Sequence, residues 1–223
     1  NFGWSSEGGA AATPHGGVLW AVAPGSPKVL RPGSPIRLKW ENGDGLVFER
    51  EIAVDERYMF TVTQKVENRG SAPVTLRSQA GIRRHGTPPS TGIWILHEGP
   101  IGVVDGALQE VDWMTALAPA NGKAFTGLFS VQSGPLGQPE YQTRVIYPKQ
   151  KLAPSETIAV TTRFFAGAKE MGALRDYQYL LDGIQEPDGF FGKLSDFFFY
   201  DGESRFTDAI DWGWFAFLTR PIF

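Results

Sequence analysis

The sequence predicts a mainly β protein, a sandwich of short strands that is followed by helices toward its C-terminal end. Hydrophobic residues make up 42% of the 223 residues and charged residues 20%, so the chain can bury a sizeable core. The 27 Gly and 16 Pro residues indicate many short elements joined by turns. From residue 18 onward, apolar and polar residues alternate with a period of two, as in strands that bury one face.

The N-terminal third contains the clearest strand signals. Residues 1–17 are rich in Gly, Ala and Ser without periodicity, so they predict a loop in which Phe2 and Trp4 are pinned to the core. Residues 36–54 predict a hairpin, because the Asn-Gly and Asp-Gly pairs at its centre supply the positive φ of a tight turn. Residues 57–68 alternate again, and the apolar side of this strand consists of Tyr58, Phe60, Val62 and Val66.

More strands and two helices are predicted beyond residue 70. Leu174, Tyr177 and Leu181 recur at helical spacing, so a helix is expected over 168–182, ending at Asp182-Gly183. A last helix is expected to begin near Ser204. One face carries Phe206, Ile210, Trp214 and Phe217, and the other carries Arg205, Asp208 and Asp211. The remaining strands are expected around Leu76 and Ala80, and over 93–97, 101–104, 124–132, 141–147 and 157–166.

Aromatic residues divide the chain. It has 16 Phe, 7 Trp and 6 Tyr residues, and twelve of these fall between Phe190 and Phe223. We therefore expect a β-sandwich domain over 1–167. A helix and aromatic connector follows over 168–203. Residues 204–223 are expected to form an amphipathic interfacial helix that leads to a membrane span.

Composition excludes several classes of function. The net charge of −3 and the pI near 5.7 argue against a nucleic-acid partner, which would favour a basic surplus. The absence of Cys removes disulfides, thiolate metal ligands and cysteine nucleophiles. The chain contains no apolar run of about 18 residues and no basic-then-apolar leader pattern.

No catalytic, cofactor-binding or metal-binding residue is predicted, and the chain is not expected to be an enzyme. His97 and Glu98 are neighbours on a predicted strand, so their side chains point to opposite faces. His15 lies in the opening loop, where it is expected to be solvated. The sequence contains no phosphate-binding loop and no Ser nucleophile elbow. A basic cluster forms either a solvated strand face or a docking site for an acidic partner or lipid headgroups: Arg77, Arg83, Arg84 and His85.

The last predicted helix carries the sharpest functional signal. Its rings occupy more than one side, which an interfacial position accommodates better than a one-sided core helix, because indole and phenyl rings are favoured at the headgroup level. The alternative is a core helix packed on the sandwich. The residues predicted to lie at the membrane interface are Ile210, Trp212, Trp214, Phe215 and Phe217.

Four segments resemble the periplasmic domain of the YidC membrane-protein insertase family. They are NFGW at 1–4, ENGDGLVFEREIAVDERYMFTVTQKVEN at 41–68, HEGPIGVVDGALQEVD at 97–112 and AIDWGWFAFLTRPIF at 209–223. The resemblance implies a β-supersandwich of the kind seen in mutarotase-like proteins. It also implies a location on the periplasmic side of the bacterial inner membrane. By comparison with the family, the N-terminal strands of the sandwich that precede Phe-Gly-Trp are expected to be missing from the domain over 1–167. The family's usual Gly-Trp-rich stretch is also missing, where Asp112 runs directly into Trp113.

The resemblance implies a non-enzymatic scaffold and docking domain without a cofactor. Its parent protein would insert and fold inner-membrane proteins, alone or with the Sec translocon. The implied partners are Sec accessory subunits, nascent membrane proteins through the rest of the parent protein, and the lipid bilayer surface through the C-terminal helix. The alternatives are a carbohydrate-binding or mutarotase-like sandwich domain, or a plain secreted sandwich. A mutarotase-like enzyme would need His85 or His97 within about 3 Å of a carboxylate in an open pocket.

Overall fold

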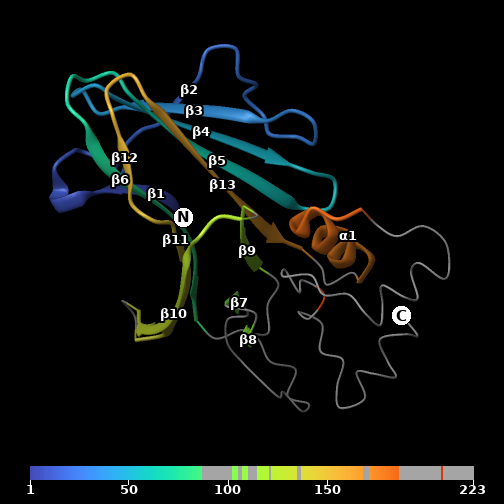
Figure 1. Cartoon of the computed structure of the whole chain (residues 1–223). Coiled ribbons are helices and arrows are strands. Elements are labelled where there is room, and N and C mark those ends of the chain that lie inside the picture. Colours follow the sequence, from blue (N-terminus) through green and yellow to red (C-terminus); the bar gives the residue numbers. More distant parts are fainter. Residues whose placement is uncertain are drawn as a thin grey trace. The chain divides into compact units, whose positions relative to one another are not determined.

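A computed structural model describes residues 1–86, 102–104, 107–109, 115–120, 122–134, 137–167, 171–185 and 207. The chain divides into two compact units. The first comprises Asn1–Pro89 with Thr115–Ala166, and the second comprises Ser90–Met114 with Gly167–Phe223. The first unit is built from two antiparallel sheets, drawn as separate layers in Figure 1, which confirms the predicted mainly β sandwich.

The larger sheet of the first unit has six antiparallel strands. It contains the predicted hairpin, whose turn is closed by the Asn42 Oδ1 atom accepting hydrogen bonds from the N–H groups of Asp44 and Leu46 at 2.8 and 2.9 Å. In spatial order the strands are β2 (Ala21–Val22), β3 (Ile36–Glu41), β4 (Leu46–Val54), β5 (Met59–Asn68), β13 (Thr157–Ala166) and β9 (Thr115–Pro119).

The smaller sheet has five strands and corrects one expectation. The predicted loop over 1–17 is wrong in its first part, because Phe2–Ser6 forms a strand that pairs along β6, with Trp4 opposite Ser78. A five-residue strand with small residues at alternate positions shows too little periodicity to be recognised. The strands are β1 (Phe2–Ser6), β6 (Val74–His85), β11 (Pro139–Ile146), β10 (Thr126–Ser133) and β12 (Gln150–Leu152), with a 3-10 turn, η1 (Glu7–Gly9), after β1.

The core lies between the two sheets. Trp4 is 4% exposed, as expected for a pinned ring, and its ring centroid lies 6.4 Å from that of Phe48 in the opposite sheet. Each sheet contributes large apolar side chains, so burial of both inner faces holds the layers together. The buried cluster consists of Trp4, Leu46, Phe48, Val66, Leu76, Val145, Tyr147, Leu152 and Val160.

β5 confirms its predicted face in part. Val62 and Val66 are buried, but Tyr58 is 62% exposed and has a φ of +68°. The reason is a turn at Asp55, whose Oδ1 atom accepts hydrogen bonds from the N–H groups of Arg57 and Met59. The strand begins only at Met59, so the alternation does not extend back to Tyr58.

Tyr147 joins the sheets through a buried hydroxyl that lies 2.7 Å from Thr162 Oγ1. Burial raises the pKa of this phenol, so the unfolded chain loses the proton near pH 10 while the folded chain retains it to higher pH. The stability associated with the neutral phenol is therefore present below about pH 10 and falls as the pH rises through the folded pKa.

We expect Tyr147→Phe to lower the free energy of unfolding by about 1 kcal/mol at neutral pH, because it removes this hydrogen bond. The deficit should shrink above about pH 10, where only the parent chain has a phenol to ionise. Urea unfolding of the parent chain and of Tyr147→Phe at neutral and alkaline pH measures this difference in the free energy of unfolding. A deficit that stays constant or grows would contradict the assigned pKa shift.

The second unit contains the one α-helix of the described residues, α1 (Met171–Asp182), which confirms the helix predicted over 168–182. Leu174, Tyr177 and Leu181 are buried, as their spacing predicts. Gln178 Oε1 accepts hydrogen bonds from the N–H and hydroxyl groups of Thr207, both at 2.8 Å. The unit also holds a short hairpin of β7 (Gly102–Val104) and β8 (Ala107–Gln109), and β7 falls within the strand predicted over 101–104.

Two predicted elements lie outside the described residues, namely the strand over 93–97 and nearly all of the helix over 204–223. Among the helical residues that are described, none forms a helix of the length and apolarity needed to cross a membrane.

Candidate functional site

The predicted membrane-interface residues are not among the described ones: Ile210, Trp212, Trp214, Phe215 and Phe217. Their assignment to an interfacial helix therefore stays a prediction. The described residues instead contain two polar arrangements on the five-stranded sheet, an ion-pair cluster around Glu140 and a cavity beside β1.

The cluster around Glu140 contains the histidine–carboxylate pair that a mutarotase-like enzyme would need. His85 Nδ1 lies 3.1 Å from Glu140 Oε2, and Arg83 Nε lies 3.2 Å from Oε1. Gln142 Nε2 also donates a hydrogen bond to Oε1 at 2.6 Å. The Glu140 side chain is only 8% exposed, so both of its oxygens are already engaged in a buried setting. Neither His85 nor Glu140 lines the neighbouring cavity, and His97 lies outside the described residues.

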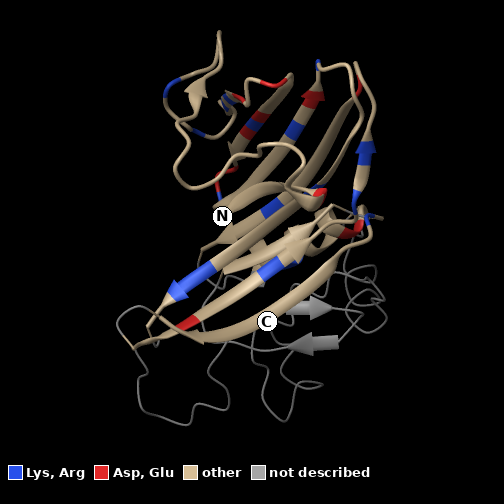
Figure 2. Ribbon diagram, turned by 90° about the vertical axis from the view of Figure 1, so that its left-hand side faces the viewer, with Lys and Arg blue, Asp and Glu red and all other residues tan. Residues whose placement is uncertain are grey.

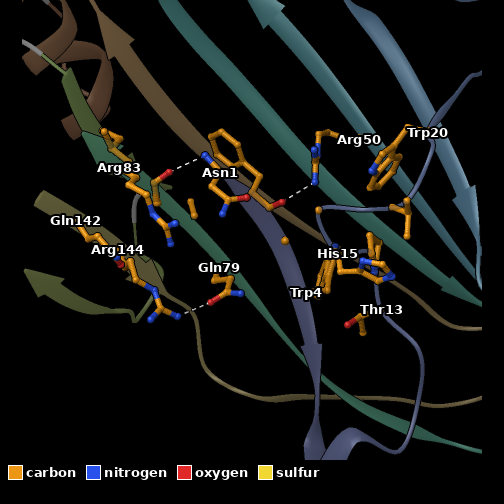
Figure 3. Close-up of a pocket in the computed structure, with 18 residues that line it drawn as sticks. Asn1, Trp4, Thr13, His15, Trp20, Arg50, Gln79, Arg83, Gln142 and Arg144 are labelled. Carbon is orange, nitrogen blue, oxygen red and sulfur yellow. Dashed lines mark hydrogen bonds between the residues drawn. The ribbon is translucent and has the colours of Figure 1, made fainter. Parts of the chain in front are cut away.

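A cavity of about 590 Å³ lies around the N-terminal half of β1 (Figure 3). Three parts of the first unit line it: β1 itself, the segment between Thr13 and Trp20, and side chains from β4, β6 and β11. Pairing of β1 with β6 and of β6 with β11 aligns residues that are distant in sequence. Figure 3 shows Arg83, Arg144 and Gln142 on one side of β1, with Arg50 and Trp20 on the other.

Arg50 projects from β4 into this cavity. Its guanidinium carbon lies 4.6 Å from the centroid of the Trp20 ring, within cation–π distance. Its Nη2 atom donates a 2.7 Å hydrogen bond to the Phe2 carbonyl, while its buried Nε has no hydrogen-bond partner. Burial lowers the pKa of Arg50, because the cation loses solvation.

Arg144 enters from β11 on the other side. Its Nη2 atom donates a 2.7 Å hydrogen bond to Gln79 Oε1, a neutral acceptor. Gly81 permits this placement, because a Cβ atom there would lie only 3.2 Å from the Arg144 Cγ. The glycine thus makes room for the arginine stem above the neighbouring strand.

His15 also lines the cavity. Its Nδ1 atom accepts a hydrogen bond from the Gly17 N–H at 3.1 Å, so the neutral imidazole carries its proton on Nε2. The predicted loop histidine is exposed, in agreement with its expected solvation, but it is also part of a cavity wall that the sequence did not reveal.

The charged side chains that line the cavity are all basic. The described residues that line it include three arginines and no Asp or Glu. Arg83 shares Glu140 with His85, whereas within the described part of the chain Arg50 and Arg144 form no ion pair. Figure 2 shows blue segments on neighbouring strands of this sheet, with a red one near an end. Such a site can attract and orient an anion, and its lining has no carboxylate to act as a general base.

Sequence reasoning recognised part of this site. It singled out Arg83 within a basic cluster, but it missed Trp20, Arg50 and Arg144, because strand pairing across long sequence separations brings these together. The described residues contain no group of three or more His, Asp or Glu side chains placed to hold a metal ion.

Comparison with known proteins gives a consistent result over the whole chain. The family model described as YidC periplasmic domain matches residues 1–112 and 113–223. The two matched segments meet between Asp112 and Trp113, where the sequence predicts that a stretch typical of the family is missing.

Individual relatives are similar at moderate identity. The chain is 38% identical over 266 residues to the membrane protein insertase YidC of Jannaschia sp. (strain CCS1). The corresponding proteins of Ruegeria pomeroyi and Caulobacter vibrioides are 34% identical over 264 residues and 35% identical over 254 residues. In each case the whole of this chain is aligned, but it spans only about two fifths of the relative's length, 39–40%.

Proposed function

Because the chain belongs to the YidC periplasmic domain family, on the periplasmic side of the bacterial inner membrane, we propose that it is a scaffold and docking domain of a membrane-protein insertase. The observation that carries the proposal is the match of the family model to both halves of the chain. The parent protein would insert and fold inner-membrane proteins, alone or with the Sec translocon, and nascent membrane proteins would contact its other parts.

A non-enzymatic role is consistent with the described geometry. A mutarotase-like activity requires a histidine and a carboxylate that converge on substrate. His85 and Glu140 meet the distance requirement, but Glu140 is buried and fully engaged, and neither residue reaches the cavity. The relatives are also named as insertases, so the carbohydrate alternative is not favoured.

The lipid bilayer surface is the first proposed partner, through residues 204–223. The rings of Trp212, Trp214 and Phe215 supply apolar area that is favoured at the headgroup level, whereas Asp208 and Asp211 leave little electrostatic attraction to anionic lipid. Membrane binding would therefore depend on ring burial. The hydrogen bonds from Thr207 to Gln178 link the one described residue of this segment to α1.

Replacing Trp212, Trp214 and Phe215 together by serine should reduce flotation of the chain with phospholipid vesicles at least about tenfold, because each buried ring contributes about 1.5–3 kcal/mol. The matched control replaces Phe197, Phe198 and Phe199 by serine, which removes three rings upstream of the helix. Equal flotation of both variants would contradict the assignment of the interface to 204–223. A circular-dichroism spectrum of each variant confirms that the sandwich is retained.

The second proposed partner is an accessory subunit of the Sec translocon, bound by the sandwich. The two sheets bury one another through a shared core, which gives the sandwich the fixed arrangement of strands that a docking scaffold needs. Binding would require neither a cofactor nor covalent chemistry.

A further inference from the structure

We propose that the cavity beside β1 binds a small organic phosphate, with its phosphate group at Arg144 and Arg83 and its organic body toward Trp20. The described lining and the charges around it carry this inference, which is independent of the docking role and of the C-terminal helix.

Charge complementarity points to an anionic ligand. Among the described residues, the wall of the cavity has three guanidinium groups, and the carboxylate of Glu140, which lies beside it, is shared between Arg83 and His85. Two of the three positive charges, on Arg50 and Arg144, are thus uncompensated within the described residues. Of these two, Arg144 lies at the end proposed for the phosphate group, beside Arg83, whereas Arg50 lies at the end proposed for the organic body. A phosphate monoester, which carries about −1.5 to −2 charges near neutral pH, would therefore meet the uncompensated guanidinium of Arg144 and the partly compensated one of Arg83.

Unused hydrogen-bond donors lie at the end of the cavity that contains Arg144 and Arg83. Arg144 uses one nitrogen on Gln79, and Arg83 uses Nε on Glu140, so both forks retain further N–H donors. Gln142, which adjoins them in Figure 3, also lines the cavity. Planar guanidinium forks of this kind favour the oxygens of phosphate.

The other end of the cavity suits an organic body. Trp4, Val18 and Trp20 contribute apolar surface there, together with the Arg50 guanidinium held at the Trp20 ring. The volume of about 590 Å³ lies within the roughly 300–1,000 Å³ of small-molecule sites and far exceeds that of a bare ion. A ligand of a phosphate and a short polar or ring-shaped body therefore fits better than inorganic phosphate.

Isothermal titration of the full chain with glycerol 3-phosphate tests the proposal, with inorganic phosphate and glycerol as separate probes. We expect single-site binding of glycerol 3-phosphate, weaker binding of inorganic phosphate and none of glycerol. Arg144→Gln should weaken glycerol 3-phosphate binding at least about tenfold, because it removes charge-assisted hydrogen bonds. The control Arg37→Gln makes the same charge change on β3, away from the cavity, and should leave the affinity unchanged.

Arg144→Lys retains the charge without the fork and should give a smaller loss, which keeps the test valid if the glutamine variant folds poorly. Absence of glycerol 3-phosphate binding, or equal affinities for Arg144→Gln and Arg37→Gln, would overturn the proposal. Vesicles of phosphatidylglycerol distinguish the two sources of phosphate. If they displace glycerol 3-phosphate from the parent chain, the site takes a lipid headgroup, and if they do not, it takes a soluble phosphate ester.

Discussion

Phe48→Ala should lower the free energy of unfolding by about 3–5 kcal/mol, the largest loss expected from a single core substitution in this chain. The Phe48 side chain is 0% exposed and lies between the two sheets. Its ring centroid is 5.6 Å from that of Trp40 in its own sheet and 6.4 Å from that of Trp4 in the other. Alanine would leave a cavity where the two sheets meet. The hydrogen bonds between neighbouring strands keep the backbone from moving in to fill it.

Urea unfolding followed by tryptophan fluorescence measures this loss. Val131→Ala is the control, because Val131 is 60% exposed on β10 and its truncation should change stability by less than about 0.5 kcal/mol. The midpoint should fall for Phe48→Ala while the denaturant slope stays close to that of the parent. Similar midpoints for the two variants would mean that the sheets do not pack through Phe48.

Gly45→Ala should be the most damaging substitution in a turn. Gly45 has a φ of +91°, and a Cβ atom there would lie 2.7 Å from the backbone nitrogen of Gly70. The Arg69 N–H donates a 2.7 Å hydrogen bond to the Gly45 carbonyl, so the β4 hairpin turn and the turn after β5 are held against each other. The clash is with backbone and cannot be relieved by moving a side chain.

Gly43→Ala separates the two effects of this substitution. Gly43 has a φ of +84° in the same turn, but nothing lies within 4 Å of its added Cβ. It should therefore show only the conformational cost of about 1–2 kcal/mol. Gly45→Ala should exceed it by about 1–3 kcal/mol, the usual cost of overpacking. Thermal and urea unfolding of both variants provide the comparison, and equal losses would show that the two turns are not in contact.

Local signals account for the parts of the fold that the sequence predicts well. The hairpin of β3 and β4 is encoded by an alternating pattern around Asn-Gly and Asp-Gly, and α1 by a helical repeat that ends at Gly183. β1 is different, because its strand character comes from pairing with β6, more than seventy residues away. A short segment without its own periodicity cannot reveal such a partner.

The candidate site was largely hidden for the same reason. Arg83 is visible in the sequence as part of a basic cluster. Arg50 and Arg144 each stand without a basic neighbour, in segments where polar and apolar residues alternate. Their gathering depends on the registers of β4, β6 and β11 and on the small residue Gly81. Glu140 forms an ion pair with Arg83 of the basic cluster. It follows a Gly-Pro-rich turn, and the sequence around it gives no signal that its side chain is buried.

Binding of the chain to the Sec translocon tests the docking role most directly. The chain would be immobilised and exposed to the purified translocon with its accessory subunits in nanodiscs, and empty nanodiscs of the same lipid would provide the reference for membrane contact through 204–223. We predict saturable binding above that reference. A signal no greater than that of empty nanodiscs would contradict the docking role.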